Sequence, residues 1–196
     1  MIYYLTVQVI PLVCTYYFMY LLFKEIIDMA RRSRRDVQVE FEPHKVNNAI
    51  DALYRVRSNL RSSIENIEKV LSILENSKNN KLCISDENLD KAKKYMTNGK
   101  KDANKSIDDF RIIFTSTTKG SVQRQKVETM REGMRCVARL VEYAETELEH
   151  FYSGKEYKTK LKLNNLIKTI NDTKEPLKEV KFWACDFENL LRSVLV

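Results

Sequence analysis

The chain has 196 residues, a formal net charge of +7, four glycines and three prolines. Sheets, hairpins and phosphate-binding loops need glycine, whereas a helix interior is destabilised by glycine (about 1 kcal/mol) and by proline (about 3 kcal/mol). The composition therefore favours an all-α fold over the glycine-rich nucleotide-binding folds, and the length suits one compact domain with an additional segment.

The first segment of the chain is apolar, because residues 2–23 contain no charged side chain. As a helix this run would be about 33 Å long, enough for the hydrocarbon core of a membrane. We predict that residues 1–23 form a single transmembrane signal anchor. A cleaved signal peptide is the alternative. However, it normally begins with basic residues and ends in small ones, and neither feature is present.

Residues 24–42 follow as a juxtamembrane linker that contains Arg31, Arg32, Arg34 and Arg35. Basic residues beside a membrane span are retained in the cytosol. The C-terminal domain is therefore expected on the cytosolic side of the endoplasmic reticulum, the secretory system or the mitochondrial outer membrane. The four arginines are also the candidate contacts for anionic lipid headgroups.

Residues 43–196 are predicted to form a helical-bundle domain. Apolar residues recur there at alternating steps of three and four, a coiled-coil-like spacing, over four long segments. Short connections between long helices imply an antiparallel up-down four-helix bundle. The same pattern would suit a dimeric coiled coil, so a homo-oligomer stays open. The four helices are expected at about 43–76, from near Ser85, from after Gly120 to Ser153, and at 156–194.

Two sequence features bear on helix continuity. Asn98-Gly99 is a turn signal inside the second helix, although the apolar spacing continues across it. The last helix is predicted to be kinked or split near Pro176, with an interruption at residues 171–173 and Thr173 as the candidate N-cap.

Arg57 occupies a position of the first helix where the apolar spacing predicts an aliphatic residue. Either its guanidinium reaches an acid on a neighbouring helix while its stem packs, or the helix face rotates and Arg57 faces solvent. In both cases Arg57→Leu is expected to be neutral or stabilising. By contrast, Val137→Asp should place an unpaired charge in the core.

Charge is concentrated in two stretches, 77–105 and 153–182, each with eight lysines against four acidic residues. We interpret them as solvated helix faces, or alternatively as surfaces that attract anionic lipid or an acidic partner. The excess is lysine and no recognition motif accompanies it, which disfavours nucleic acid.

The side chains of most metal and catalytic sites are scarce in this chain. It has two histidines, and its four cysteines include no C-x-x-C pair; Cys136 and Cys185 are expected to be buried as small hydrophobes. Glu147 and His150 have the E-x-x-H spacing of di-iron bundles, but those sites need a second copy, which the chain lacks. We therefore expect no catalytic residue, metal or cofactor, and a non-enzymatic role.

The resulting hypothesis is a membrane-anchored scaffold, tether or adaptor that acts through protein–protein contacts. A secreted or lumenal helical ligand with a cleaved signal is one alternative, for which the sequons at Asn104 and Asn171 would matter. A module that binds anionic lipid surfaces is the other.

Overall fold

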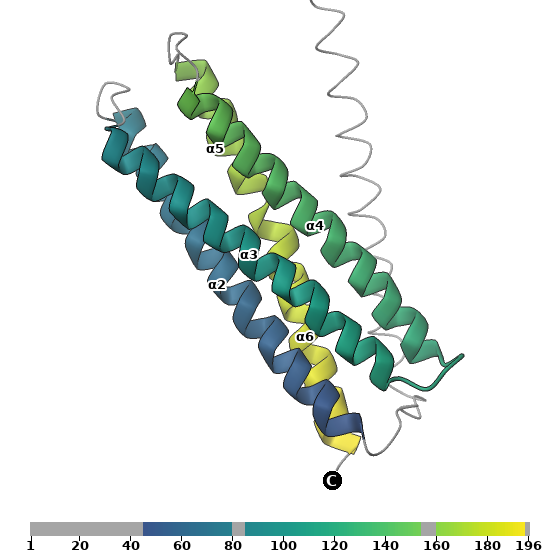
Figure 1. Ribbon diagram of the computed structural model, residues 1–196. Helices are drawn as coiled ribbons and strands as arrows, with labels where there is room; N and C mark the ends of the chain where they lie inside the picture. Colours follow the sequence, from purple (N-terminus) through teal and green to yellow (C-terminus); the bar gives the residue numbers. More distant parts are fainter. Residues whose placement is uncertain (1–44, 80–84, 154–159, 195–196) are drawn as a thin grey trace, which may run out of the picture. The chain divides into compact units, whose positions relative to one another are not determined.

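The structure, a computed structural model, describes residues 45–79, 85–153 and 160–194, all of which belong to one compact unit, Glu40–Val196. Apart from short connections these residues are helical, so the predicted all-α fold is confirmed. Figure 1 shows the chain running along one axis in an up-down-up-down order, with the last two helices in series. The helices are α2 (Val46–Asn79), α3 (Asp86–Ser116), α4 (Val122–Ser153), α5 (Lys160–Asp172) and α6 (Lys174–Val194).

The predicted anchor at 1–23 and the linker at 24–42 lie outside the described residues and stay predictions. Within the described ranges, no helix is both long enough and apolar enough to cross a membrane.

The start of α3, near Ser85 as predicted, is capped by a side chain. The hydroxyl of Ser85 accepts a hydrogen bond from the backbone N–H of Asn88 at 3.3 Å, and Asp86 and Glu87 occupy the first turn. Negative side chains there favour the positive end of the helix dipole.

Helix α3, the second of the predicted helices, is continuous across Asn98-Gly99, because packing against α2 outweighs the local turn signal. The Ser63 hydroxyl of α2 donates to the Gly99 carbonyl at 2.9 Å. A Cβ atom on Gly99 would lie 3.4 Å from the Ser63 carbonyl oxygen. Glycine therefore allows the backbones of α2 and α3 to approach closely at this point.

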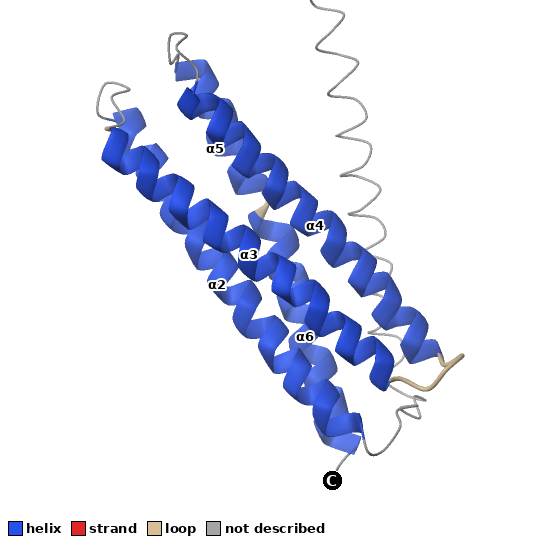
Figure 2. Ribbon diagram, viewed as in Figure 1, coloured by secondary structure: helices blue, strands red, loops and turns tan. Residues whose placement is uncertain are grey.

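The predicted split of the last helix is confirmed, and Figure 2 shows it as a short loop between α5 and α6. Pro176 has no N–H, and its ring would clash with the carbonyl of residue 172 in a continuous helix. Thr173 directly precedes α6, as an N-cap residue does. Its hydroxyl, however, donates back to the Ile170 carbonyl at 2.7 Å and so closes the end of α5.

The core follows the predicted apolar spacing closely. Helix α2 packs against α3, α5 and α6, so a broad face of it is buried, including Val56 beside Arg57. On α3, Ser106 is buried and the neighbouring Ile107 is half-buried, although the apolar spacing favours Ile107. Cys136 and Cys185 are half-buried rather than buried as expected. The α2 residues that follow the alternating spacing of three and four are all buried: Val46, Ile50, Leu53, Leu60, Ile64, Ile67, Leu71 and Leu74.

Candidate functional site

The residues singled out from the sequence do not form a site among the described residues. Arg31, Arg32, Arg34 and Arg35 lie outside the described ranges, and their role as lipid contacts stays a prediction. Of the E-x-x-H pair on α4, His150 is exposed in the last turn. Burial and the neighbouring Glu147 raise the pKa of Tyr143. Across residues 45–79, 85–153 and 160–194, no three His, Cys, Asp or Glu side chains converge as metal ligands.

The lysine-rich faces are partly neutralised by acids close to them. On α3, Lys93 lies 3.2 Å from Glu149 of α4, and Lys105 lies 2.9 Å from Asp102. Such pairs favour the interpretation of these stretches as solvated helix faces. Further pairs of the same kind are Lys91–Glu87, Lys174–Glu68 and Lys178–Glu175.

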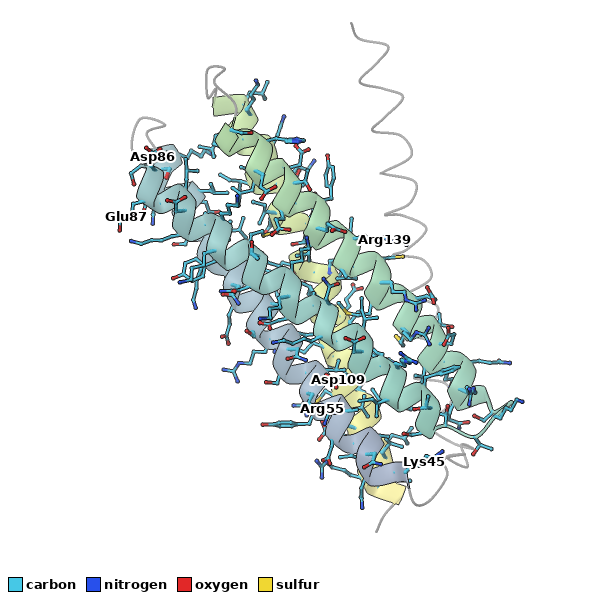
Figure 3. The ribbon with its side chains drawn as sticks, viewed as in Figure 1. Lys45, Arg55, Asp86, Glu87, Asp109 and Arg139 are labelled. Atoms are coloured by element: carbon cyan, nitrogen blue, oxygen red, sulfur yellow. The ribbon has the colours of Figure 1, made fainter. Side chains whose placement is uncertain are left out.

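Three buried acids link neighbouring helices, and the first joins α3 to α2. Asp109 of α3 accepts a hydrogen bond from Arg55 Nε at 2.8 Å and one from Asn59 Nδ2 at 3.2 Å, both from α2. Figure 3 labels Arg55 and Asp109, which face one another between the two helices. Asp109 is 8% exposed, so its charge needs these partners.

The second acid joins α4 to α3. Glu145 accepts hydrogen bonds from the Thr97 hydroxyl at 2.7 Å and from the Lys100 ammonium at 2.8 Å. Burial alone would raise the pKa of Glu145, but the hydrogen bonds from Lys100 and Thr97 outweigh it and hold the pKa below its ordinary value. The hydrogen bond to Glu145 in turn raises the pKa of Lys100.

The third acid joins α6 to α2 and settles the environment of Arg57. Glu188 accepts a hydrogen bond from Arg57 at 2.6 Å and another from Arg192 Nε at 3.0 Å. Burial acts to raise the pKa of Glu188, and the two guanidinium groups more than offset it, so the pKa is lowered. The first of the two predictions for Arg57, that it reaches an acid on a neighbouring helix, is confirmed.

An aromatic cluster fills the core beside this ion pair. Trp183 and Phe187 of α6 stack with their ring centroids 4.9 Å apart, and Trp183 also meets Phe110 of α3 at 5.8 Å. Trp183 therefore reaches across the bundle interior to the helix diagonally opposite its own.

The pairing of these three acids with neighbouring helices was not predicted from the sequence, although the sequence contains a signal for it. Asp109, Glu145 and Glu188 each lie directly beside a residue of the apolar spacing, namely Phe110, Ala144 and Phe187 respectively. Positions that flank a heptad seam commonly carry inter-helix ion pairs. Glu145 and Glu188, whose pKa values are lowered, stay ionised at neutral pH, which suits them to holding helices together rather than to transferring protons.

A different arrangement, rich in cations, lies where α3 ends and α4 begins. The ring of Phe114 carries the guanidinium carbon of Arg124 at 4.0 Å and that of Arg131 at 5.4 Å from its centroid. Arg124 also donates to the Thr117 carbonyl at 3.3 Å. Both cations are thus held in place by an aromatic face. We call this surface the basic end; it comprises Arg111, Lys119, Arg124, Lys126 and Arg131.

Comparisons of the chain with protein-family models, with curated proteins and with solved structures gave no match.

Proposed function

We propose that this protein is a non-catalytic, membrane-anchored scaffold, tether or adaptor. In this proposal residues 1–23 hold the chain in a membrane. The bundle domain, residues 43–196, presents its helix surfaces to a protein partner on the cytosolic side.

The observation that carries the proposal is that buried acids pair with basic side chains of neighbouring helices. Asp109, Glu145 and Glu188 each accept hydrogen bonds from basic side chains of a neighbouring helix. Such pairs specify which helices lie together and resist sliding between them. These pairs support the interpretation of the bundle as a rigid rod. Helix α2, with 34 residues, is about 51 Å long. A rod of this length can hold a partner at a set distance from a membrane.

The secreted or lumenal ligand is the second candidate, and the exposed side chains of Asn104 and Asn171 favour it. Both would be accessible glycosylation acceptors if the domain entered the secretory lumen.

Expression of the full chain in animal cells separates the two candidates. The cytosolic topology predicts that protease added to intact microsomes digests the bundle, and that glycosidase treatment leaves the mass unchanged. A mass loss on glycosidase treatment that disappears in the Asn104→Gln/Asn171→Gln variant would contradict the cytosolic scaffold and favour the lumenal ligand.

A further inference from the structure

The two halves of α4 carry opposite charge. Residues 122–141 have five basic side chains against two acidic ones, whereas residues 142–153 have four glutamates and no lysine or arginine. This order is unfavourable at the two ends of the helix, where Arg124 lies in the first turn and Glu149 just before the last turn, because cations are stabilised at the C-terminus and anions at the N-terminus.

The acidic half has an explanation inside the bundle. Glu142 and Glu145 lie 3.2 Å and 2.8 Å from the Lys100 ammonium of α3, and Glu149 lies 3.2 Å from Lys93. These contacts between helices offset the unfavourable position of the glutamates.

The basic residues of α4 have a different kind of ion-pair partner. Arg131 and Arg135 pair with Glu128 and Glu132, which belong to the same helix. In the part of the chain that the structure describes, no acid of another helix forms an ion pair with the basic residues of this half. The bundle therefore keeps an excess of positive charge at the start of α4.

The basic end is also held in shape. Arg124 and Arg131 both lie over the ring of Phe114, and Lys119 is exposed in the turn that leads into α4. Gly120, with a φ of 84°, gives this turn its tight form. Arg131 is paired with Glu128, but within the described ranges Lys119, Arg124 and Lys126 form no ion pair, so their charges stay available to an external anion. This geometry suits a surface that carries many anionic groups.

The chain order indicates which anionic surface this is. Figure 1 shows that α2 begins at the same end of the bundle as the turn between α3 and α4. The predicted anchor joins the bundle there, through residues 24–44, which can span at most about 70 Å. A tether makes docking on the same membrane an intramolecular event, so weak attraction of about 1 kcal/mol per basic residue is sufficient.

We infer that the basic end docks on the anionic headgroups of the membrane in which residues 1–23 are anchored. This inference rests on the proposed function. It moves the lipid contact from the lysine-rich stretches, which are partly paired, to the α3–α4 end of the bundle. Docking there would set the rod on its end, with the far end directed away from the membrane.

The test is a lysine footprint of the full chain in vesicles. The chain is reconstituted in vesicles of phosphatidylcholine alone and of phosphatidylcholine and phosphatidylserine in equal parts. It is then acetylated with a water-soluble reagent and read by mass spectrometry. We expect the labelling of Lys119 and Lys126 to fall several-fold in the anionic vesicles and to recover in high salt. Lys78 and Lys94, towards the other end of the bundle, report non-specific effects.

Neutralising substitutions provide the matched comparison. Arg124→Gln/Arg131→Gln should remove most of the protection of Lys119 and Lys126. Arg61→Gln/Lys101→Gln removes the same charge at exposed positions elsewhere and should retain the protection.

Equal labelling of Lys119 and Lys126 in both kinds of vesicle would overturn the inference and leave an acidic protein as the partner of this end. A different outcome is that alkaline pH releases the chain from neutral vesicles while Lys119 and Lys126 are still protected on anionic ones. This result would contradict the anchor and support the docking of the basic end. The two failures are therefore distinguishable.

Discussion

Glu188 is held on α6 between the guanidinium groups of Arg57 and Arg192. The side chain of Glu188 is 5% exposed, whereas those of Arg57 and Arg192 are 34% and 57% exposed. The loss of one arginine leaves a buried carboxylate under-compensated, while the loss of the carboxylate leaves two cations that can reach water. The two ends of this ion pair are therefore not equivalent.

We predict that Arg57→Leu destabilises the bundle by about 1–2 kcal/mol. This is less than for a fully buried pair, because Arg192 remains and Arg57 is partly exposed. Glu188→Leu should lower the free energy of unfolding by less. The double variant Arg57→Leu/Glu188→Leu should regain most of the stability that Arg57→Leu loses. Denaturant unfolding of the four proteins measures the coupling.

Arg61→Leu is the control for this cycle, because Arg61 forms an exposed pair with Glu65 and should have a small effect. Strictly additive losses in the cycle would show that Arg57 and Glu188 are not coupled. The spacing alone suggested that Arg57→Leu would be neutral or stabilising. The structure changes that expectation, because the burial of Glu188 cannot be read from the first helix.

The lowered pKa values of Glu145 and Glu188 predict how stability depends on pH. A carboxyl group with a lower pKa in the folded state contributes stability that is complete above its unfolded pKa, near 4.5. That contribution is lost as the pH falls through the folded pKa. Glu145→Gln should therefore be less stable than the native chain at neutral pH, and the difference should shrink in acid. Thermal melts at a series of pH values measure this, and a constant difference would contradict it.

Helices α2 and α3 approach one another closely at Gly99. Gly99→Ala should be close to neutral, because the new Cβ would meet the Ser63 carbonyl at 3.4 Å while alanine gains up to about 1 kcal/mol in helix propensity. Gly99→Leu should be clearly destabilising, because no space remains between the helices. Asn104→Leu, at an exposed position of the same helix, is the control. Equal melting temperatures for the two leucine variants would show that the approach is not tight.

Helix α4 provides the corresponding test of the core. Val137 is fully buried, and Val137→Asp should cost several kcal/mol, comparable to the whole stability of a small domain. Thr129→Asp introduces the same charge at an exposed position of the same helix and should change stability little. A mild effect of Val137→Asp in denaturant unfolding would mean that the core is wet or open at this point.

The apolar spacing was sufficient to predict which face of each helix is buried, because burial alone imposes a period of three and four. It could not predict which neighbour each face meets. Asp109, Glu145 and Glu188 depend on that neighbour, since their partners lie 54, 45 and 131 residues away in the chain. Ser106 was missed for a local reason: its hydroxyl donates to the Asp102 carbonyl, so a polar residue can be buried there.

For the whole molecule, the antiparallel order gives the two ends of the bundle different charge. Asp86 and Glu87 begin α3 at one end, and Lys45 precedes α2 at the other, as Figure 3 shows. The basic end lies at the same end of the bundle as the start of α2. In the proposed anchoring, the basic end is therefore the end of the bundle that residues 24–44 join.

Alkaline extraction of membranes from cells that express the full chain tests whether residues 1–23 form the proposed anchor. We predict that the native chain stays in the membrane pellet. Ile10→Arg/Val13→Arg should release it, because each arginine near the centre of a span opposes insertion by about 2.5–3.5 kcal/mol. Tyr54→Arg/Phe182→Arg, which adds the same charge at exposed positions of the bundle, should stay in the pellet. Release of the native chain into the alkaline supernatant would show that residues 1–23 do not anchor it.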